Sequence, residues 1–82
     1  MDILSAKKIF IAIVPNKNMF SPAVLEYGFG KDCVYELSTG YIMDAVIFGV
    51  TIVNTETNEH DTQRSKPFET LAEAGKYIES LK

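Results

Sequence analysis

The longest apolar run of the chain lies at residues 41–53, YIMDAVIFGVTIV, where only Asp44 and Thr51 are polar apart from the tyrosine hydroxyl. One register of this run carries Ile42, Val46, Phe48, Val50 and Ile52, and the other carries Met43, Ala45, Ile47 and Val53. A strand that is apolar in both registers is typical of a sheet covered on both faces. The pattern therefore predicts a central strand over 41–53.

Two shorter runs are also predicted to be strands. Residues 7–14, KKIFIAIV, are apolar in both registers after the two lysines, and Pro15 with the following asparagines ends the run. Residues 33–38, CVYELS, alternate as a half-buried strand does. Thr39-Gly40 separates 33–38 from the central run, which predicts a tight hairpin between two antiparallel strands.

Two further segments give weaker patterns. Ser21-Pro22 is a typical helix start and Gly28 a typical helix end, which favours a short helix over 22–27. The alternative is an extended segment over 23–29. Residues 60–65 are polar throughout, so any strand there is expected at the edge of the sheet.

The C-terminal segment predicts an amphipathic helix over 71–81. Thr70 and Glu73 form a capping box, and an apolar stripe follows it, made of Leu71, Ala74, Ile78 and Leu81. We therefore expect one α+β domain over 1–82, with a three- to four-stranded, mainly antiparallel sheet. Its strands would be 7–14, 33–38, 41–53 and 60–65, with the C-terminal helix packed on one face.

Composition narrows the classes of function. The chain has 82 residues and a net charge of −3, and its pI is about 5.0, which argues against general attraction to nucleic acid or anionic membranes. The run at 41–53 is shorter than the roughly 18–20 residues of a membrane helix. A single cysteine, Cys33, excludes an intramolecular disulfide, and we expect a cytoplasmic protein.

Motifs for a cofactor or a metal ion are incomplete. Gly28–Lys31 has neither the first glycine nor the hydroxyl residue of a phosphate-binding loop. The oxygen-rich residues 54–65 have Glu59 where a calcium loop requires glycine and Ser65 where it requires glutamate. The sequence thus predicts no cofactor, no metal and no small-molecule ligand. A small enzyme that uses Cys33 with His60 is one alternative.

The favoured interpretation is a small non-enzymatic binding or regulatory protein that acts through protein contacts. The candidate binding residues are Tyr27, Phe29, Lys31, Tyr35, Tyr41 and Asp44. Tyrosines are frequent anchors of interfaces. A nucleic-acid-binding module that uses the 27–35 segment is another alternative, since GFGK partly matches an aromatic RNA-binding strand.

The same patterns predict association. The sheet has two apolar faces, whereas the helix over 71–81 can cover only one of them. A helix over 22–27 spans only about 9 Å, too little to cover the second face. We therefore expect a homodimer or an obligate complex with another chain, in which the apolar face is shared. Asp44 would lie at the rim of that interface or pair across it.

Overall fold

The computed structural model describes residues 3–13 and 23–82. Its elements, in chain order, are α1 Ile3–Ile13, β1 Ala23–Phe29, β2 Cys33–Ile42, β3 Ala45–Asn54, β4 Glu59–His60, β5 Lys66–Phe68 and α2 Leu71–Leu81. The described residues confirm the α+β class and the C-terminal helix. Neither described helix has the length and apolar character needed to cross a membrane.

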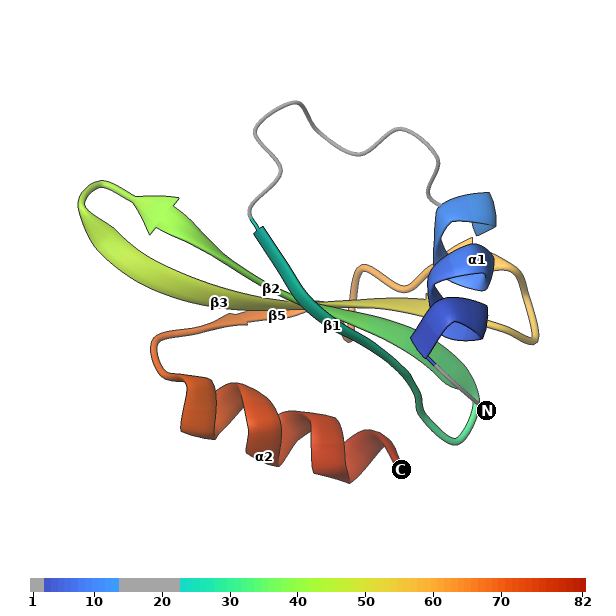
Figure 1. Cartoon of the computed structure of the whole chain (residues 1–82). Helices are drawn as coiled ribbons and strands as arrows, with labels where there is room; N and C mark the ends of the chain where they lie inside the picture. Colours follow the sequence, from blue (N-terminus) through green and yellow to red (C-terminus); the bar gives the residue numbers. More distant parts are fainter. Residues whose placement is uncertain (1–2, 14–22) are drawn as a thin grey trace.

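All the strand pairs are antiparallel. The sheet has the order β1-β2-β3-β4, and β5 also pairs with β3. The longest ladder joins β2 to β3, from Cys33 opposite Asn54 to Ile42 opposite Ala45. The two helices lie on opposite faces of this sheet, and the β2–β3 hairpin extends beyond both of them (Figure 1).

Helix α2 covers one face and begins as the capping box predicts. The Thr70 hydroxyl oxygen accepts the backbone N–H of Glu73 at 3.1 Å and donates to the Glu73 carboxylate at 3.0 Å. The helix buries Ala74, Ile78 and Leu81 against the sheet side chains Cys33, Tyr35, Leu37, Val50 and Ile52. Alternate positions of β2 and β3 thus point to α2, as the period of a strand requires.

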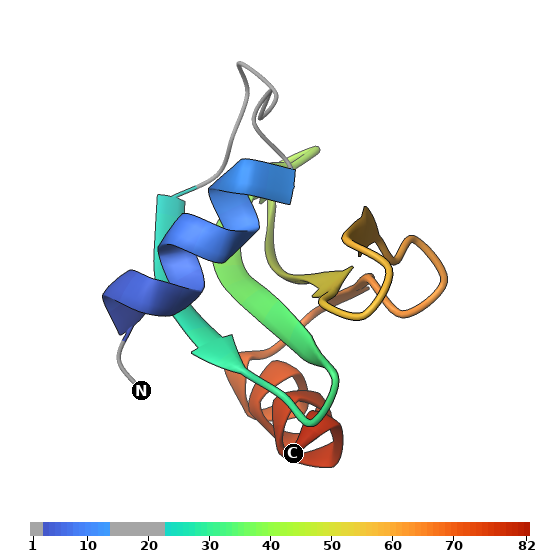
Figure 2. The same ribbon diagram turned by 90° about the vertical axis from the view of Figure 1, so that its right-hand side faces the viewer.

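Helix α1 covers part of the other face, over β1 and β2 (Figure 2). Ala6 and Phe10 pack there with Tyr27, Val34 and Val53. The Phe10 and Tyr27 rings meet edge to face with centroids 5.6 Å apart. Each face of the sheet therefore has its own small hydrophobic core, one under α2 and one under α1.

The prediction of a strand over 7–14 is wrong, because the described part of that segment belongs to α1. Its apolar residues suit either period, but the spacing of Ala6, Phe10 and Ile13 places them on one helix face that the sheet can bury. Val14 and the turn predicted behind it lie outside the described residues. The premise that one sheet face lacks a helix is also wrong, and self-association stays a prediction.

The short helix over 22–27 is wrong as well. Residues 23–29 form β1, which was the alternative, because a helix of under two turns is unstable alone whereas pairing with β2 satisfies the backbone. The helix start predicted at Ser21-Pro22 lies outside the described residues. Of the edge strand predicted over 60–65, only His60 is in a strand, because Ser65 and Asp61 form a hydrogen-bonded turn instead.

The hairpin turn predicted at Thr39-Gly40 is at Met43-Asp44 instead, so Tyr41 and Ile42 belong to β2 rather than to the central strand. A turn at 39–40 would have set Tyr35 opposite Asp44. The observed register sets Tyr35 opposite Ile52 and Val34 opposite Val53. Burial of both faces therefore selects the register, since a shifted register would lose these pairs.

Candidate functional site

The closed end of the β2–β3 hairpin carries the two most exposed large apolar side chains among the described residues, Met43 and Tyr41. Tyr41 is 79% exposed, Met43 95% and Val46 44%. Tyr41 lies directly opposite Val46, on the α2 side of the sheet by strand alternation from Leu37. This end extends past the start of α2 (Figure 1). We call Tyr41, Met43, Asp44 and Val46 the hairpin end.

The turn at the hairpin end has an unusual backbone for its sequence. Met43 has φ 50° and Asp44 has φ 69°, and a two-residue hairpin turn with both φ positive normally carries Asn-Gly or Asp-Gly. An L side chain in this region costs about 1–2 kcal/mol. The most exposed apolar residue thus occupies a position that asparagine or glycine would fill with less strain.

The base of the hairpin is held by packing. Leu37 and Val50 are buried against α2, and Phe48 pairs with Phe68 of β5. The Phe68 ring packs on Tyr77 of α2, with centroids 5.2 Å apart. The hairpin end therefore extends from two paired strands whose other ends are packed in the core.

The other predicted binding residues are not near the hairpin end. Tyr27 and Phe29 belong to the cluster under α1, whereas Tyr35 is buried under α2. Lys31 is in the turn between β1 and β2, where its backbone N–H donates to the Leu81 carbonyl at 2.7 Å. The six residues thus occupy three places, and only Tyr41 and Asp44 share an exposed one.

The buried tyrosines have structural partners. Burial, followed by a hydrogen bond to Glu36 and the charge of that carboxylate, raises the pKa of Tyr27 to about 12. Burial and the neighbouring Glu26 also raise the pKa of Tyr35. Phe29 and Tyr35 point to opposite faces of the sheet, so they do not make the aromatic platform on which bases stack.

Cys33 and His60 are not brought together. Cys33 pairs with Asn54 on one side of β3, and His60 pairs with Val53 on the other side. Cys33 is buried under α2, and burial raises the pKa of its thiol above the usual value, although the Arg64 charge opposes the rise. A buried thiol with a raised pKa is a poor nucleophile.

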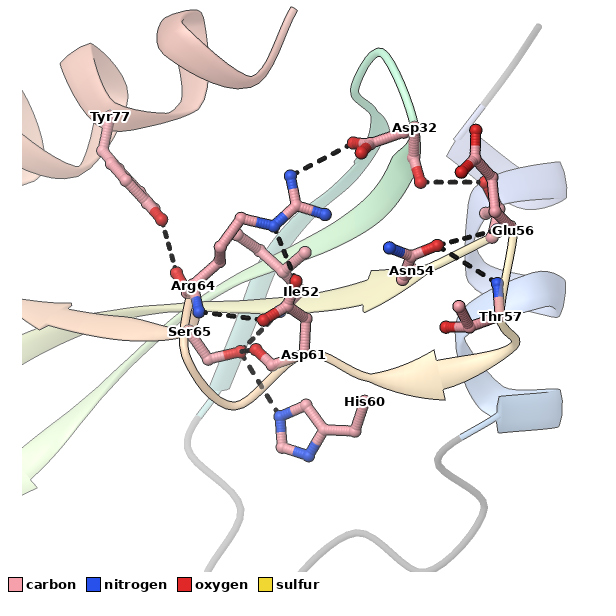
Figure 3. A network of polar contacts seen from close by, with 11 residues as sticks. Asp32, Ile52, Asn54, Glu56, Thr57, His60, Asp61, Arg64, Ser65 and Tyr77 are labelled. Carbon is pink, nitrogen blue, oxygen red and sulfur yellow. Dashed lines mark hydrogen bonds and ion pairs between the residues drawn. The ribbon is translucent and has the colours of Figure 1, made fainter.

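A polar network joins the β1–β2 turn to the connection between β4 and β5 (Figure 3). The Arg64 guanidinium donates to Asp61 at 2.6 Å and to Asp32 at 3.1 Å. The Arg64 hydrogen bonds hold the pKa of Asp61 below its usual value. The Tyr77 hydroxyl donates to the Arg64 carbonyl at 2.5 Å, so the network also holds α2. These contacts link three parts of the fold.

His60 lies beside Ser65 in the same region, with Nε2 3.3 Å from Oγ. The Ser65 hydroxyl donates to the Asp61 carbonyl at 2.7 Å and accepts the Ile52 N–H at 2.9 Å. The Ser65 hydroxyl proton is therefore already donated to the Asp61 carbonyl. His60 can only donate a hydrogen bond to the Ser65 oxygen and is not placed to accept that proton as a base. This pair closes a turn and does not form an activated nucleophile.

A shallow polar hollow of about 250 Å³ opens next to His60. Its lining consists of Asn54, Thr57, Glu59, His60, Asp61, Thr62 and Gln63. The Asn54 side-chain oxygen already accepts the N–H groups of Glu56 and Thr57, at 2.8 and 3.2 Å. Within residues 3–13 and 23–82, no three His, Cys, Asp or Glu side chains gather as metal ligands, and no buried side-chain nitrogen or oxygen lacks a partner.

Comparison with protein-family models, curated proteins and solved structures finds no match to this chain. The candidate site therefore rests on geometry. Sequence reasoning missed Met43 and Val46, because it assigned both to a buried central strand. A Met-Asp pair inside an apolar run carries no turn signature, and only the pairing of β2 with β3 shows that it is the exposed end.

Proposed function

We propose that this chain is a non-enzymatic binding protein that engages a partner protein through its hairpin end. The observation that carries the proposal is the exposure of Met43 and Tyr41 at a turn with two positive φ angles. Strained backbone and exposed apolar side chains together are more typical of binding positions than of a solvated turn. Tyr and Met are also enriched at the cores of interfaces.

The geometry favours a concave, apolar acceptor on the partner. Tyr41 and Val46 are cross-strand neighbours, so their side chains form one face, and Met43 caps the tip. Methionine adapts its shape to irregular pockets. Asp44, beside it in the turn, favours a partner whose pocket has a basic rim. The ordered base of the hairpin limits the entropy lost on binding.

Quantitative affinity capture from a lysate of the source organism tests the proposal. The bait variant is Tyr41→Ser combined with Met43→Ser, and the matched control is Leu71→Ser, which removes a half-exposed apolar residue from α2. We expect one partner to be retained by the wild type and by the control, and to fall at least tenfold with the hairpin variant. Equal retention by all three proteins, each folded by circular dichroism, contradicts the proposal.

A further inference from the structure

The outer edge of β1 is a second candidate surface, because no strand within residues 3–13 and 23–82 pairs with it. β1 is the terminal strand of the sheet. The Gly30 N–H donates to the Cys33 carbonyl at 2.8 Å, so Gly30 and Cys33 are a hydrogen-bonded pair that closes the turn. Because such pairs alternate with non-bonded pairs, Tyr27 and Phe29 direct their backbone N–H and C=O groups away from β2.

The regular part of this edge is short and symmetric. The ladder between β1 and β2 is irregular between Val24 and Glu26. Uninterrupted pairing with β2 therefore covers residues 26–29 of the strand and the hydrogen-bonded Gly30 that follows it. The centre of this stretch is Gly28. A Cβ at Gly28 would overlap the Tyr35 ring, so this position has no room for a side chain. We call residues 26–30 the β1 edge.

We propose that two copies of the chain pair antiparallel through the β1 edge, with a two-fold axis between their Gly28 residues. This register uses all five regular residues of each copy. Tyr27 of one copy lies opposite Phe29 of the other, which gives four intermolecular backbone hydrogen bonds. Glu26 lies opposite Gly30 of the other copy, so no like charges face each other.

Helix α1 supports the choice of a second copy as the occupant. α1 lies over β1 in each copy (Figure 2). Because the axis is perpendicular to the extended sheet, the two α1 helices would lie on the same face of that sheet. α1 buries Ala6 and Phe10 but leaves Ile9 and Ile11 exposed. A helix that is apolar on several sides normally has more than one packing partner. Ile9 and Ile11 point about 100° to either side of Phe10, so each flank of α1 carries an exposed isoleucine. The flank of α1 that faces the second copy therefore meets the same apolar flank of its α1.

The expected dimer is weak. Five residues of edge and part of one helix bury less than the roughly 800 Å² per partner of a standard stable interface. The irregularity next to the edge also limits its extension, as in strands that avoid indefinite pairing. Association is therefore expected at high concentration, and it uses a surface separate from the hairpin end.

Sedimentation equilibrium combined with amide hydrogen exchange by NMR tests the pairing over roughly 10 µM to 1 mM. We expect the mass to rise from 9.2 kDa towards twice that value. The Tyr27 and Phe29 amides should become protected in proportion to the dimer fraction. A monomer throughout overturns the proposal, and so does a dimer in which these two amides stay unprotected.

A charge exchange tests the register. Leu25, half exposed, and Lys31 directly flank the paired residues 26–30, so Leu25 of one copy would lie near Lys31 of the other across the interface. We expect Leu25→Lys to raise the dissociation constant at least tenfold and Leu25→Lys with Lys31→Glu to restore it within threefold. No recovery in the double variant overturns this register.

Two controls separate this inference from the proposed function. Tyr41→Ser with Met43→Ser should leave the dimer unchanged, whereas Leu25→Lys should leave partner capture unchanged. If the chain stays monomeric and the captured partner protects the Tyr27 and Phe29 amides, the edge accepts a foreign strand. That outcome overturns self-pairing.

Discussion

Replacing the turn by Asn-Gly, with Met43→Asn and Asp44→Gly, is expected to stabilise the fold. Both residues have positive φ, 50° and 69°, and asparagine and glycine adopt this region with little strain. Met43 is 95% exposed, so its replacement removes almost no buried apolar surface. The change therefore acts on the backbone of the turn.

The magnitude follows from two opposing effects. Relief of the left-handed conformation is worth about 1–2 kcal/mol at Met43 and less at Asp44, because aspartate tolerates this region. Glycine at position 44 increases the entropy of the unfolded chain and removes about 0.4–1 kcal/mol of that gain. The net expectation is about 1 kcal/mol, which corresponds to a rise in Tm of about 4–8 °C for a chain of this size.

Urea unfolding followed by circular dichroism measures this gain. The matched control is Met43→Ala, which removes the same exposed side chain but places a residue that disfavours positive φ there. It should change the free energy of unfolding by less than about 0.5 kcal/mol. A gain of equal size in the control would refute the reasoning, since it would come from the side chain. Absence of a gain in the Asn-Gly variant would refute it as well.

Two further predictions concern the core. Gly28→Ala should destabilise the fold by about 1–3 kcal/mol because the new Cβ overlaps the buried Tyr35 ring. Gly75→Ala, with no neighbour within 4 Å, should instead stabilise α2 by up to about 1 kcal/mol. Similar urea midpoints for the two variants would contradict this prediction. Since the pKa of Tyr27 is raised from 10.0 to about 12, its stabilising effect is complete below pH 10 and is lost between pH 10 and 12. Tyr27→Phe should reduce the fall in urea midpoint between pH 9 and pH 11.5, and an unchanged fall would disprove the assignment.

Local sequence patterns predicted an element correctly where its structure depends mainly on its own residues. The capping box at Thr70 and Glu73 and the stripe that follows it predicted α2 correctly, because cap and period agree there. Residues 33–38 are likewise a strand, as predicted, although β2 continues to Ile42. These parts fixed the α+β class.

The errors lie where partners elsewhere in the chain decide the structure. The segment 7–13 has apolar residues on all sides and suits either period, so only its contact with Tyr27 and Val34 selects a helix. Residues 23–29 are a strand because their backbone pairs with the edge of β2. The candidate site depended on the same information, since the true turn position exposes Met43 and Val46, which the predicted hairpin would have buried.

The most direct test of the proposed function is NMR mapping of the partner's footprint. The isotope-labelled chain is titrated with the partner obtained by capture, and the amide shift changes are followed along the sequence. The account predicts the largest changes between Thr39 and Phe48, centred on Met43, with little change at Asp61, Arg64 and Ser65. A footprint centred on the Arg64 network or the polar hollow near His60, with the hairpin end unaffected, would contradict it.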